Sequence, residues 1–179
     1  MTRTQLEHLI RAAADLAEDD EIVVLGSQAI LGQFPDAPAT LRVSVEADLY
    51  PRRRPERADL IDGTIGEGSP FHETYGYYAQ GVGEETAVLP AGWKDRLVAV
   101  RNEATRGATG WCLEPHDLVI AKAVAGRERD REFVREAIRH RLVDQPTLGE
   151  RLAGTPVLPV VADRVRGWFA ADFALPRAG

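Results

Sequence analysis

Two acidic residues, Glu46 and Asp48, stand at alternate positions of a segment whose pattern predicts a β-strand. In residues 41–49 the odd positions are apolar and the even positions polar or ionisable, which is typical of a strand with one face of each kind. Both carboxylates therefore share a face with Ser44 and Arg42. Adjacent carboxylates repel unless a cation joins them, and Mg²⁺ prefers one or two carboxylates plus substrate phosphates. The pair predicts metal-dependent phosphoryl chemistry; the alternative is a solvated strand face carrying incidental acids.

A Gly-Ser pair, Gly26 and Ser27, follows an apolar run at residues 22–25 that predicts a buried strand. Residues 28–33 predict a short helix directly after it. A helix N-terminus offers free N–H groups and the positive end of a dipole, so a phosphate can bind there. Glycine lets the backbone approach closely, and Ser27 can add a hydroxyl. One interpretation is a phosphate-binding turn; the other is an ordinary turn in which the serine caps the helix.

A run of mixed charge at residues 122–130 is the third candidate for chemistry. Lys122, Gly126 and Arg129 fall at positions i, i+4 and i+7, so one continuous helix would align them. Asp130 follows directly. Two cations beside a carboxylate could bind a triphosphate and orient it. The alternative is a solvated charged face with local Arg–Asp pairs.

Composition and charge exclude several classes of protein. The chain has 179 residues, a net charge of −6 and an isoelectric point near 5.3, so we expect no coating of DNA. A local basic cleft with Arg42 and Arg129 as its walls stays open. Cys112 is the only cysteine, which excludes an internal disulfide and indicates a reducing cytoplasm. No apolar run is long enough for a membrane span, no signal peptide is visible, and four histidines show no zinc spacing.

The elements that would position these residues follow from periodicity and turn signals. Helices, strands and proline-delimited turns alternate in an order that predicts an α+β fold. We expect a domain over residues 1–145 and a C-terminal helical extension over 146–179, packed on the same domain. Expected helices cover residues 6–17, 28–33, 56–65, 115–125 and 129–142, with two more among prolines 146, 156 and 159; expected strands cover 22–25, 41–49, 75–82, 85–89, 97–101 and 110–113.

The three candidate segments together resemble the nucleotidyltransferase superfamily of the polymerase-β type. A strand, Gly-Ser, a short helix and a strand bearing paired acids is that superfamily's arrangement. Over residues 20–140 the chain is similar to bacterial minimal-nucleotidyltransferase-like proteins of undefined function, related to the AbiEii and MenT nucleotidyltransferase toxins. The stretches that carry the resemblance are GSQAILGQFPDAP, SVEADLYP, GTIGEGSPFHETYGYYAQGV, LPAGWKDRL and GWCLEPHDLVIAKAVAGRERDREFV.

The resemblance implies a mixed, nucleotidyltransferase-like β-sheet flanked by helices, and a role for each candidate residue. Glu46 and Asp48 match the paired metal-binding acids, and Ser44 matches a modification or activity site. The implied catalytic set comprises Ser44, Glu46, Asp48, Lys122 and Asp130, and the implied nucleotide-binding set comprises Gly26, Ser27, Arg42, Lys122 and Arg129.

The implied activity is transfer of a nucleoside monophosphate from an NTP to an RNA or protein hydroxyl with Mg²⁺ or Mn²⁺. The acceptor expected from the toxin relatives is a tRNA or a protein, and a cognate antitoxin is an expected partner. Two departures favour an alternative, a catalytically inactive module that binds nucleotide or protein. Glu46 stands where active members usually have Asp, and no third carboxylate can be assigned on a neighbouring strand.

Lysine is rare in this chain, because only Lys94 and Lys122 are lysines among 22 basic residues. The ten-to-one excess of arginine is typical of a GC-rich bacterial genome, so a lysine in the third segment is unexpected. An ammonium is a compact point charge, whereas a guanidinium is a planar fork. We therefore expect Lys122→Arg to keep the fold and to reduce nucleotide transfer strongly, with Lys94 as the control position.

Overall fold

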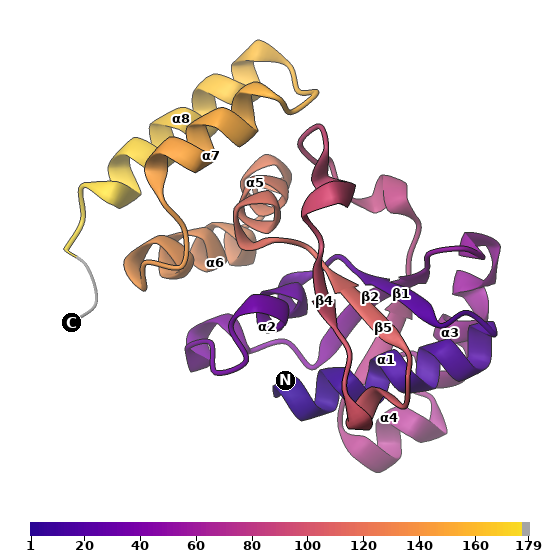
Figure 1. Cartoon of the computed structure of the whole chain (residues 1–179). Helices are drawn as coiled ribbons and strands as arrows, with labels where there is room; N and C mark the ends of the chain where they lie inside the picture. The colour runs from indigo at the N-terminus through magenta and orange to yellow at the C-terminus, as the bar shows by residue number, and fades with distance from the viewer. Residues whose placement is uncertain (177–179) are drawn as a thin grey trace. The chain divides into compact units, whose positions relative to one another are not determined.

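The computed structural model describes residues 1–176 and divides the chain into two compact units. Unit 1 comprises Met1–Thr86 and Leu97–Glu114, and unit 2 comprises Ala87–Arg96 and the chain from Pro115 onward. Figure 1 labels the main elements of both.

Unit 1 is built on one mixed sheet whose strand order is β3-β2-β1-β5-β4. Figure 1 labels β1, β2, β4 and β5 of this sheet. Strand β1 pairs antiparallel with β2 and parallel with β5, β2 pairs parallel with β3, and β4 pairs antiparallel with β5. The strands are β1 (Glu21–Val24), β2 (Glu46–Pro51), β3 (Tyr78–Gly81), β4 (Val98–Val100) and β5 (Thr109–Cys112), and the helices are α1 (Arg3–Ala17), α2 (Ile30–Gln33), α3 (Ala58–Ile65) and α4 (Pro70–Tyr75). The predicted α+β class, a mixed sheet flanked by helices, is confirmed.

Helix α1 forms where the apolar period predicted a helix. A capping box at its start joins Thr2 and Gln5, and most of its apolar stripe, including Leu6, Leu9 and Ile10, is buried, with contacts to the sheet. On strand β5, Gly110 leaves the room that the side chain of Ile10 occupies. On strand β3, Gly81 likewise lets the backbone of α3 approach. Small residues in two strands therefore set how closely these helices pack.

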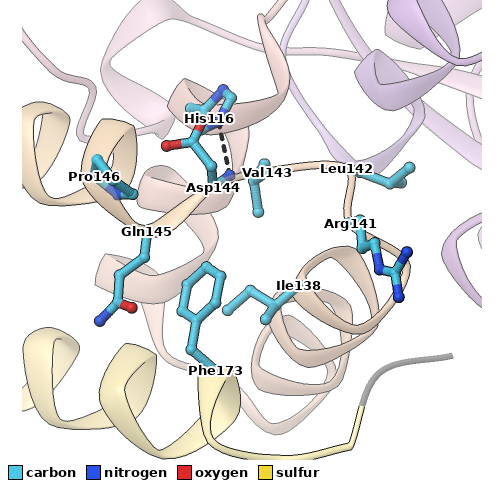
Figure 2. Close-up of a pocket in the computed structure, with 9 residues that line it drawn as sticks. All are labelled: His116, Ile138, Arg141, Leu142, Val143, Asp144, Gln145, Pro146 and Phe173. Atoms are coloured by element: carbon cyan, nitrogen blue, oxygen red, sulfur yellow. Dashed lines mark hydrogen bonds and ion pairs between the residues drawn. The ribbon is translucent and has the colours of Figure 1, made fainter.

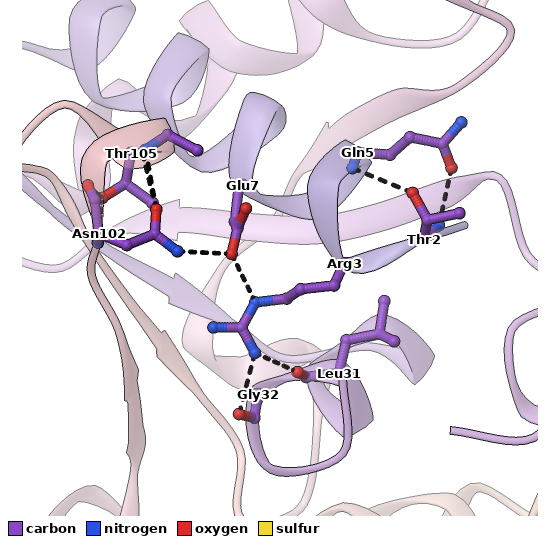
Figure 3. Close-up of polar contacts among 9 residues, drawn as sticks. Thr2, Arg3, Gln5, Glu7, Leu31, Gly32, Asn102 and Thr105 are labelled. Atoms are coloured by element: carbon purple, nitrogen blue, oxygen red, sulfur yellow. Dashed lines mark hydrogen bonds and ion pairs between the residues drawn. The ribbon is translucent and has the colours of Figure 1, made fainter. Parts of the chain in front are cut away.

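Helix α2 is tied to α1 by a polar network that Figure 3 shows. The guanidinium of Arg3 donates to the carbonyls of Leu31 at 2.7 Å and Gly32 at 3.2 Å, and its Nε donates to Glu7 at 2.9 Å. The amide of Asn102 also donates to Glu7, at 2.8 Å. Because α2 directly follows the Gly-Ser turn, this network fixes the segment that carries the turn.

Two strand predictions, 41–49 and 75–82, were wrong in part, and a third, 85–89, was wrong. Strand β2 begins only at Glu46, and the apolar Val43 and Val45 before it are 78% and 45% exposed, so alternation there did not reflect a buried face. Helix α4 takes up most of the segment before β3, and residues 84–86 form a 3₁₀ turn rather than a strand. The second and third departures adjoin Gly76 and Gly83, and the first adjoins the local turn that the Ser44 hydroxyl forms with the amide of Glu46, so local backbone chemistry outweighs a short apolar pattern at each place.

Unit 2 is helical, with α5 (Pro115–Ala125), α6 (Glu128–Arg139), α7 (Gln145–Ala153) and α8 (Pro159–Phe173). The predicted C-terminal helices are therefore present, and proline stands in the first turn of α5, α7 and α8, as expected. The fully buried Asp117 of α5 is held by Arg96 through two hydrogen bonds, at 2.8 Å and 3.0 Å. Among residues 1–176, no helix combines the length and apolar character needed to cross a membrane.

Candidate functional site

Strand β2 brings the two acids to one face of the sheet. Ala47 and Leu49 are buried, whereas Glu46 and Asp48, which alternate with them, are partly exposed. Because successive side chains of a strand point to opposite faces, both carboxylates lie on the same face of the sheet. The prediction of an acidic strand face therefore holds for the segment that begins at Glu46.

The Gly-Ser turn lies directly against this acidic face. The amide of Leu25 donates to the carbonyl of Asp48 at 3.0 Å, which joins the end of β1 to β2 beside the turn. A Cβ atom built on Gly26 would lie 1.6 Å from Oδ2 of Asp48, so no larger residue fits without moving the carboxylate. The structure thus places the Gly-Ser turn next to the acid pair, two segments that only the resemblance to the superfamily had linked in the sequence analysis.

The helix after the turn is shorter than a phosphate-binding helix usually is. Ser27 begins a 3₁₀ turn of three residues, and α2 adds four more. A dipole over so short a stretch is small, since aligned peptide units must add to build it. Any contribution of Gly26 and Ser27 to phosphate binding would therefore come from close backbone approach and the serine hydroxyl.

Strand β3 supplies the residues opposite the acids. Its parallel register places Tyr78 beside Glu46 and Gln80 beside Asp48. The hydroxyl of Tyr78 donates to Oε2 of Glu46 at 3.1 Å. Burial, reinforced by the charge of Glu46, raises the pKa of Tyr78 to about 12, so the phenol stays protonated and remains a donor. The position that faces Asp48 carries an exposed amide rather than a third carboxylate.

Tyr78 was missed as a site residue in the sequence analysis. Tyr75, Tyr77 and Tyr78 stand close together in the sequence, and no local pattern distinguishes Tyr78 from the other two. The signal that was available is its place in the strand that follows α3 and α4, because a strand after a crossover can pair parallel with the strand before it.

Helix α4 places a histidine against Tyr78. Ser69 caps this helix by accepting from the amide of His72, and Nδ1 of His72 accepts from the amide of Gly68 at 3.1 Å. The imidazole ring lies on the Tyr78 ring with 4.6 Å between centroids. The backbone bond to Nδ1 leaves Nε2 as the protonated nitrogen of the neutral ring.

An aromatic cluster anchors the other side of α4. The ring of His8 lies 5.1 Å from that of Phe71 and 4.8 Å from that of Tyr75, measured between centroids. Nδ1 of His8 and the Tyr77 hydroxyl are 2.7 Å apart. Burial and the nearby charge of Arg11 lower the pKa of His8, so the imidazole is neutral at neutral pH. The cluster holds α4 by packing and not by ion pairing.

Ser44 and Arg42 precede β2 and do not share its strand face. The Ser44 hydroxyl accepts from the amide of Glu46 at 3.1 Å, a local turn at the start of the strand. The carbonyls of both residues accept from the amino group of Met1, and the Ser44 carbonyl also accepts from the buried Gln28 at 3.2 Å. The expectation that Ser44 and Arg42 share the strand face of the acids was therefore wrong, and Ser44 forms the turn that starts the strand.

The third predicted segment lies in unit 2 and does not form one helix. Gly126 adopts a φ of +69° and separates α5 from α6, so the continuous helix that would align Lys122 with Arg129 does not form, in keeping with the separate helices expected over 115–125 and 129–142. Nζ of Lys122 instead donates to Oδ1 of Asp130 at 2.8 Å across the turn. Arg129 is exposed at the start of α6, whereas Asp130 is only 2% exposed. Two of the three ionic residues are thus paired with each other.

The donor set on β2 fits one hard divalent cation. Mg²⁺ commonly keeps several waters and takes one or two protein carboxylates together with substrate phosphates, which Glu46 and Asp48 can provide. Oxygen donors suit Mg²⁺ or Mn²⁺ better than zinc. Within the described residues no group of three or more His, Cys, Asp or Glu side chains could hold a metal by itself. A cation here would therefore depend on substrate oxygens to complete its coordination.

A pocket of about 410 Å³ lies in unit 2 and contains none of the predicted site residues (Figure 2). His116 and Asp144 form its polar side, where Nε2 of the imidazole accepts from the amide of Asp144 at 3.1 Å. Ile138 and Phe173 form an apolar side. Neither Glu46 nor Asp48 lines this pocket, so the presence of a cavity does not identify the acids as a site.

Comparison with known protein families identifies a family model that covers most of the chain. A family model described as "nucleotidyltransferase of unknown function (DUF6036)" matches residues 4–170. No curated protein and no solved structure matches the chain. The matched range includes the Gly-Ser turn, the acid pair and the Lys122–Asp130 pair.

Proposed function

The chain belongs to this nucleotidyltransferase family, and we propose that it transfers a nucleoside monophosphate from an NTP to a hydroxyl group. The observation that carries the proposal is the contact between the Gly-Ser turn and the acidic face of β2. Gly26 leaves the space that the carboxylate of Asp48 occupies, with Glu46 on the same face. A turn open to close approach and two carboxylates are the parts that a triphosphate and its cation need.

Glu46 and Asp48 are the residues that would hold Mg²⁺ or Mn²⁺, and the ion would supply neutralisation of the phosphate charge. Gly26 and Ser27 would receive the phosphates. The acceptor oxygen forms a bond to the α-phosphorus, the bond from that phosphorus to the pyrophosphate oxygen breaks, and the hydroxyl proton passes to water. The contribution of the protein is positioning and electrostatic stabilisation.

Lys122, Arg129 and Asp130 remain proposed contributors to nucleotide binding, and Arg42 remains a proposed contact for the phosphates. The ion pair between Lys122 and Asp130 gives Lys122 a structural role as well. A lysine that has both roles can be tested by a substitution that keeps its charge.

The acceptor that we propose is an RNA, with a tRNA 3′ end as the first candidate, or a protein hydroxyl. Ser44 is a candidate acceptor in the chain itself, because its hydroxyl lies beside Glu46. A role as the toxin of a bacterial toxin–antitoxin pair, with a cognate antitoxin and a cytoplasmic location, follows from the resemblance to nucleotidyltransferase toxins and is part of the same proposal.

The test is incubation of the purified protein with each α-labelled NTP, Mg²⁺ or Mn²⁺, and total tRNA or cell protein. We expect label on one acceptor class with wild type and none with Glu46→Gln plus Asp48→Asn, which preserve side-chain size. Lack of transfer, together with unchanged metal and nucleotide binding in the double variant, would contradict the proposal.

A second candidate is a catalytically inactive module that binds nucleotide or a protein partner. One observation favours it: Gln80, and not an acid, stands in register with Asp48 on the neighbouring strand. Nucleotide binding without turnover for every NTP and acceptor class would select this alternative.

A further inference from the structure

The longer side chain of Glu46 has a specific partner in the neighbouring strand. Register pairs Glu46 with Tyr78, and the phenol donates to Oε2 of the carboxylate at 3.1 Å. Within residues 1–176, the other carboxylate oxygen, Oε1, makes no hydrogen bond or ion pair. Oε2 of Glu46 is therefore fixed by Tyr78, and Oε1 of the same carboxylate is available to a ligand.

We propose that Tyr78 is a positioning residue that holds Glu46 in the orientation in which it accepts a divalent cation. This inference rests on the proposed function, because it assigns Glu46 as a cation ligand. Residues that hydrogen-bond a metal ligand fix its orientation, and their loss commonly weakens metal binding. Here the partner is a neutral donor, so it orients the carboxylate without neutralising it.

The surroundings of Tyr78 keep its hydroxyl in place. Tyr78 is 9% exposed, and the His72 ring lies against its ring. His72 is in turn fixed by Gly68 and by the serine cap of α4. A donor that is held by packing and by a short capped helix loses little freedom when it forms this hydrogen bond.

Glu46 and Tyr78 therefore act as a matched pair. Aspartate at this position would withdraw the carboxylate by about one bond length, roughly 1.5 Å, and would lose the 3.1 Å hydrogen bond. We expect Glu46→Asp to weaken cation binding, although aspartate is the usual residue here in active members of the superfamily that the chain resembles. If Glu46 were only a poorer cation ligand than aspartate, the same substitution would strengthen cation binding.

The test measures binding of Mn²⁺ alone by calorimetry and electron paramagnetic resonance in wild type, Tyr78→Phe, Glu46→Asp and the double variant. We expect Tyr78→Phe to raise the Mn²⁺ Kd by about tenfold or more. In the Glu46→Asp background, where the hydrogen bond is already lost, Tyr78→Phe should change the Kd by less than about twofold. Equal effects of Tyr78→Phe in both backgrounds would overturn the inference, because the tyrosine would then act independently of Glu46.

Tyr75→Phe is the matched control, since it removes one tyrosine hydroxyl from α4, where the ring packs on His8 and Phe71. It should bind Mn²⁺ like wild type, and an equal loss in both phenylalanine variants would overturn the inference. Wild type that binds no Mn²⁺ would contradict the metal role in the proposed function.

If no Mn²⁺ binds, the positioning role of Tyr78 can still be tested without metal, from the NMR ¹³C signal of the Glu46 carboxyl group in wild type and Tyr78→Phe. A shifted and more mobile signal in Tyr78→Phe supports the inference, and an unchanged signal overturns it.

Discussion

The carboxylate of Asp48 occupies the space next to Gly26 where the side chain of any other residue would begin. A Cβ atom at position 26 would come within 1.6 Å of Oδ2 and 2.7 Å of Cγ of Asp48. The glycine is therefore required by its neighbour on β2, because its own φ of −67° is open to every residue. This relationship links the turn to the acid and leads to the first prediction.

Gly26→Ala should displace the Asp48 carboxylate and reduce nucleotide transfer or nucleotide binding by about 100-fold, the effect of misplacing a reacting group by about 1 Å. Overpacking should also lower the free energy of unfolding by about 1–3 kcal/mol. Titration of nucleotide and a urea melt check the two effects.

Gly63→Ala is the control, because a Cβ there meets no atom within 4 Å and the residue lies inside α3. It should raise the free energy of unfolding by about 0.5–1 kcal/mol and leave nucleotide binding unchanged. Equal behaviour of the two alanine variants would contradict the steric role of Gly26.

Removal of Lys122 should leave a charged group buried without its partner. Asp130 is 2% exposed, and its Oδ2 has no hydrogen-bond partner, so the 2.8 Å contact with Lys122 is its main compensation. Lys122→Met should lower the free energy of unfolding by about 3 kcal/mol. The double variant Lys122→Met/Asp130→Leu should regain most of that loss, as chemical denaturation can measure. A single variant as stable as wild type would show that the pair does not stabilise the fold.

Lys122→Arg separates the structural role of this residue from its proposed role in nucleotide binding. Arginine keeps the positive charge that pairs with Asp130, so thermal unfolding should change little. Nucleotide transfer should fall strongly, since a longer, planar fork places its donors differently from a compact ammonium and would shift the phosphate that it contacts. Lys94→Arg makes the same exchange at the other lysine of the chain and should leave transfer intact. Full transfer activity in Lys122→Arg would exclude a specific need for lysine.

Arg141 lies just after the end of α6 in a conformation that favours glycine. Its φ is +59°, and the amides of Arg141 and Leu142 donate to the carbonyls of Ile138 and Ala137, both at 3.0 Å, which is the bonding pattern of a Schellman motif. Arg141→Gly should therefore raise the free energy of unfolding by about 0.5–1 kcal/mol. Arg141→Ala removes the same charge and should give no such gain. Calorimetric melting of the two variants distinguishes backbone strain from a charge effect.

Cys112 should be inert to alkylating reagents in the folded protein. Its thiol is fully buried, and burial raises its pKa to about 12, so the reactive thiolate is scarce at neutral and mildly alkaline pH. Iodoacetamide labelling followed by mass spectrometry should show no modification under native conditions and complete modification in denaturant. Rapid native labelling would indicate that β5 opens readily.

The amino-acid sequence by itself determined most of what is local. The apolar period of α1, the prolines that begin α5 and α8, and the i, i+2 spacing of Glu46 and Asp48 each depend on neighbours a few residues away. These features predicted the α+β class and put both acids on one strand face. Where local turns compete with a short apolar pattern, as before Glu46, the same reasoning misplaced the start of the strand.

Only the tertiary structure decided which residues surround the acids. Tyr78 lies 32 residues after Glu46, and their contact depends on the parallel register of β2 and β3. A shift of that register by one residue would send the phenol to the other face, and no spacing in the sequence records the choice. The fit of Gly26 against Asp48 likewise arises from the pairing of β1 with β2, because long-range strand pairing is set by the packing of the whole sheet.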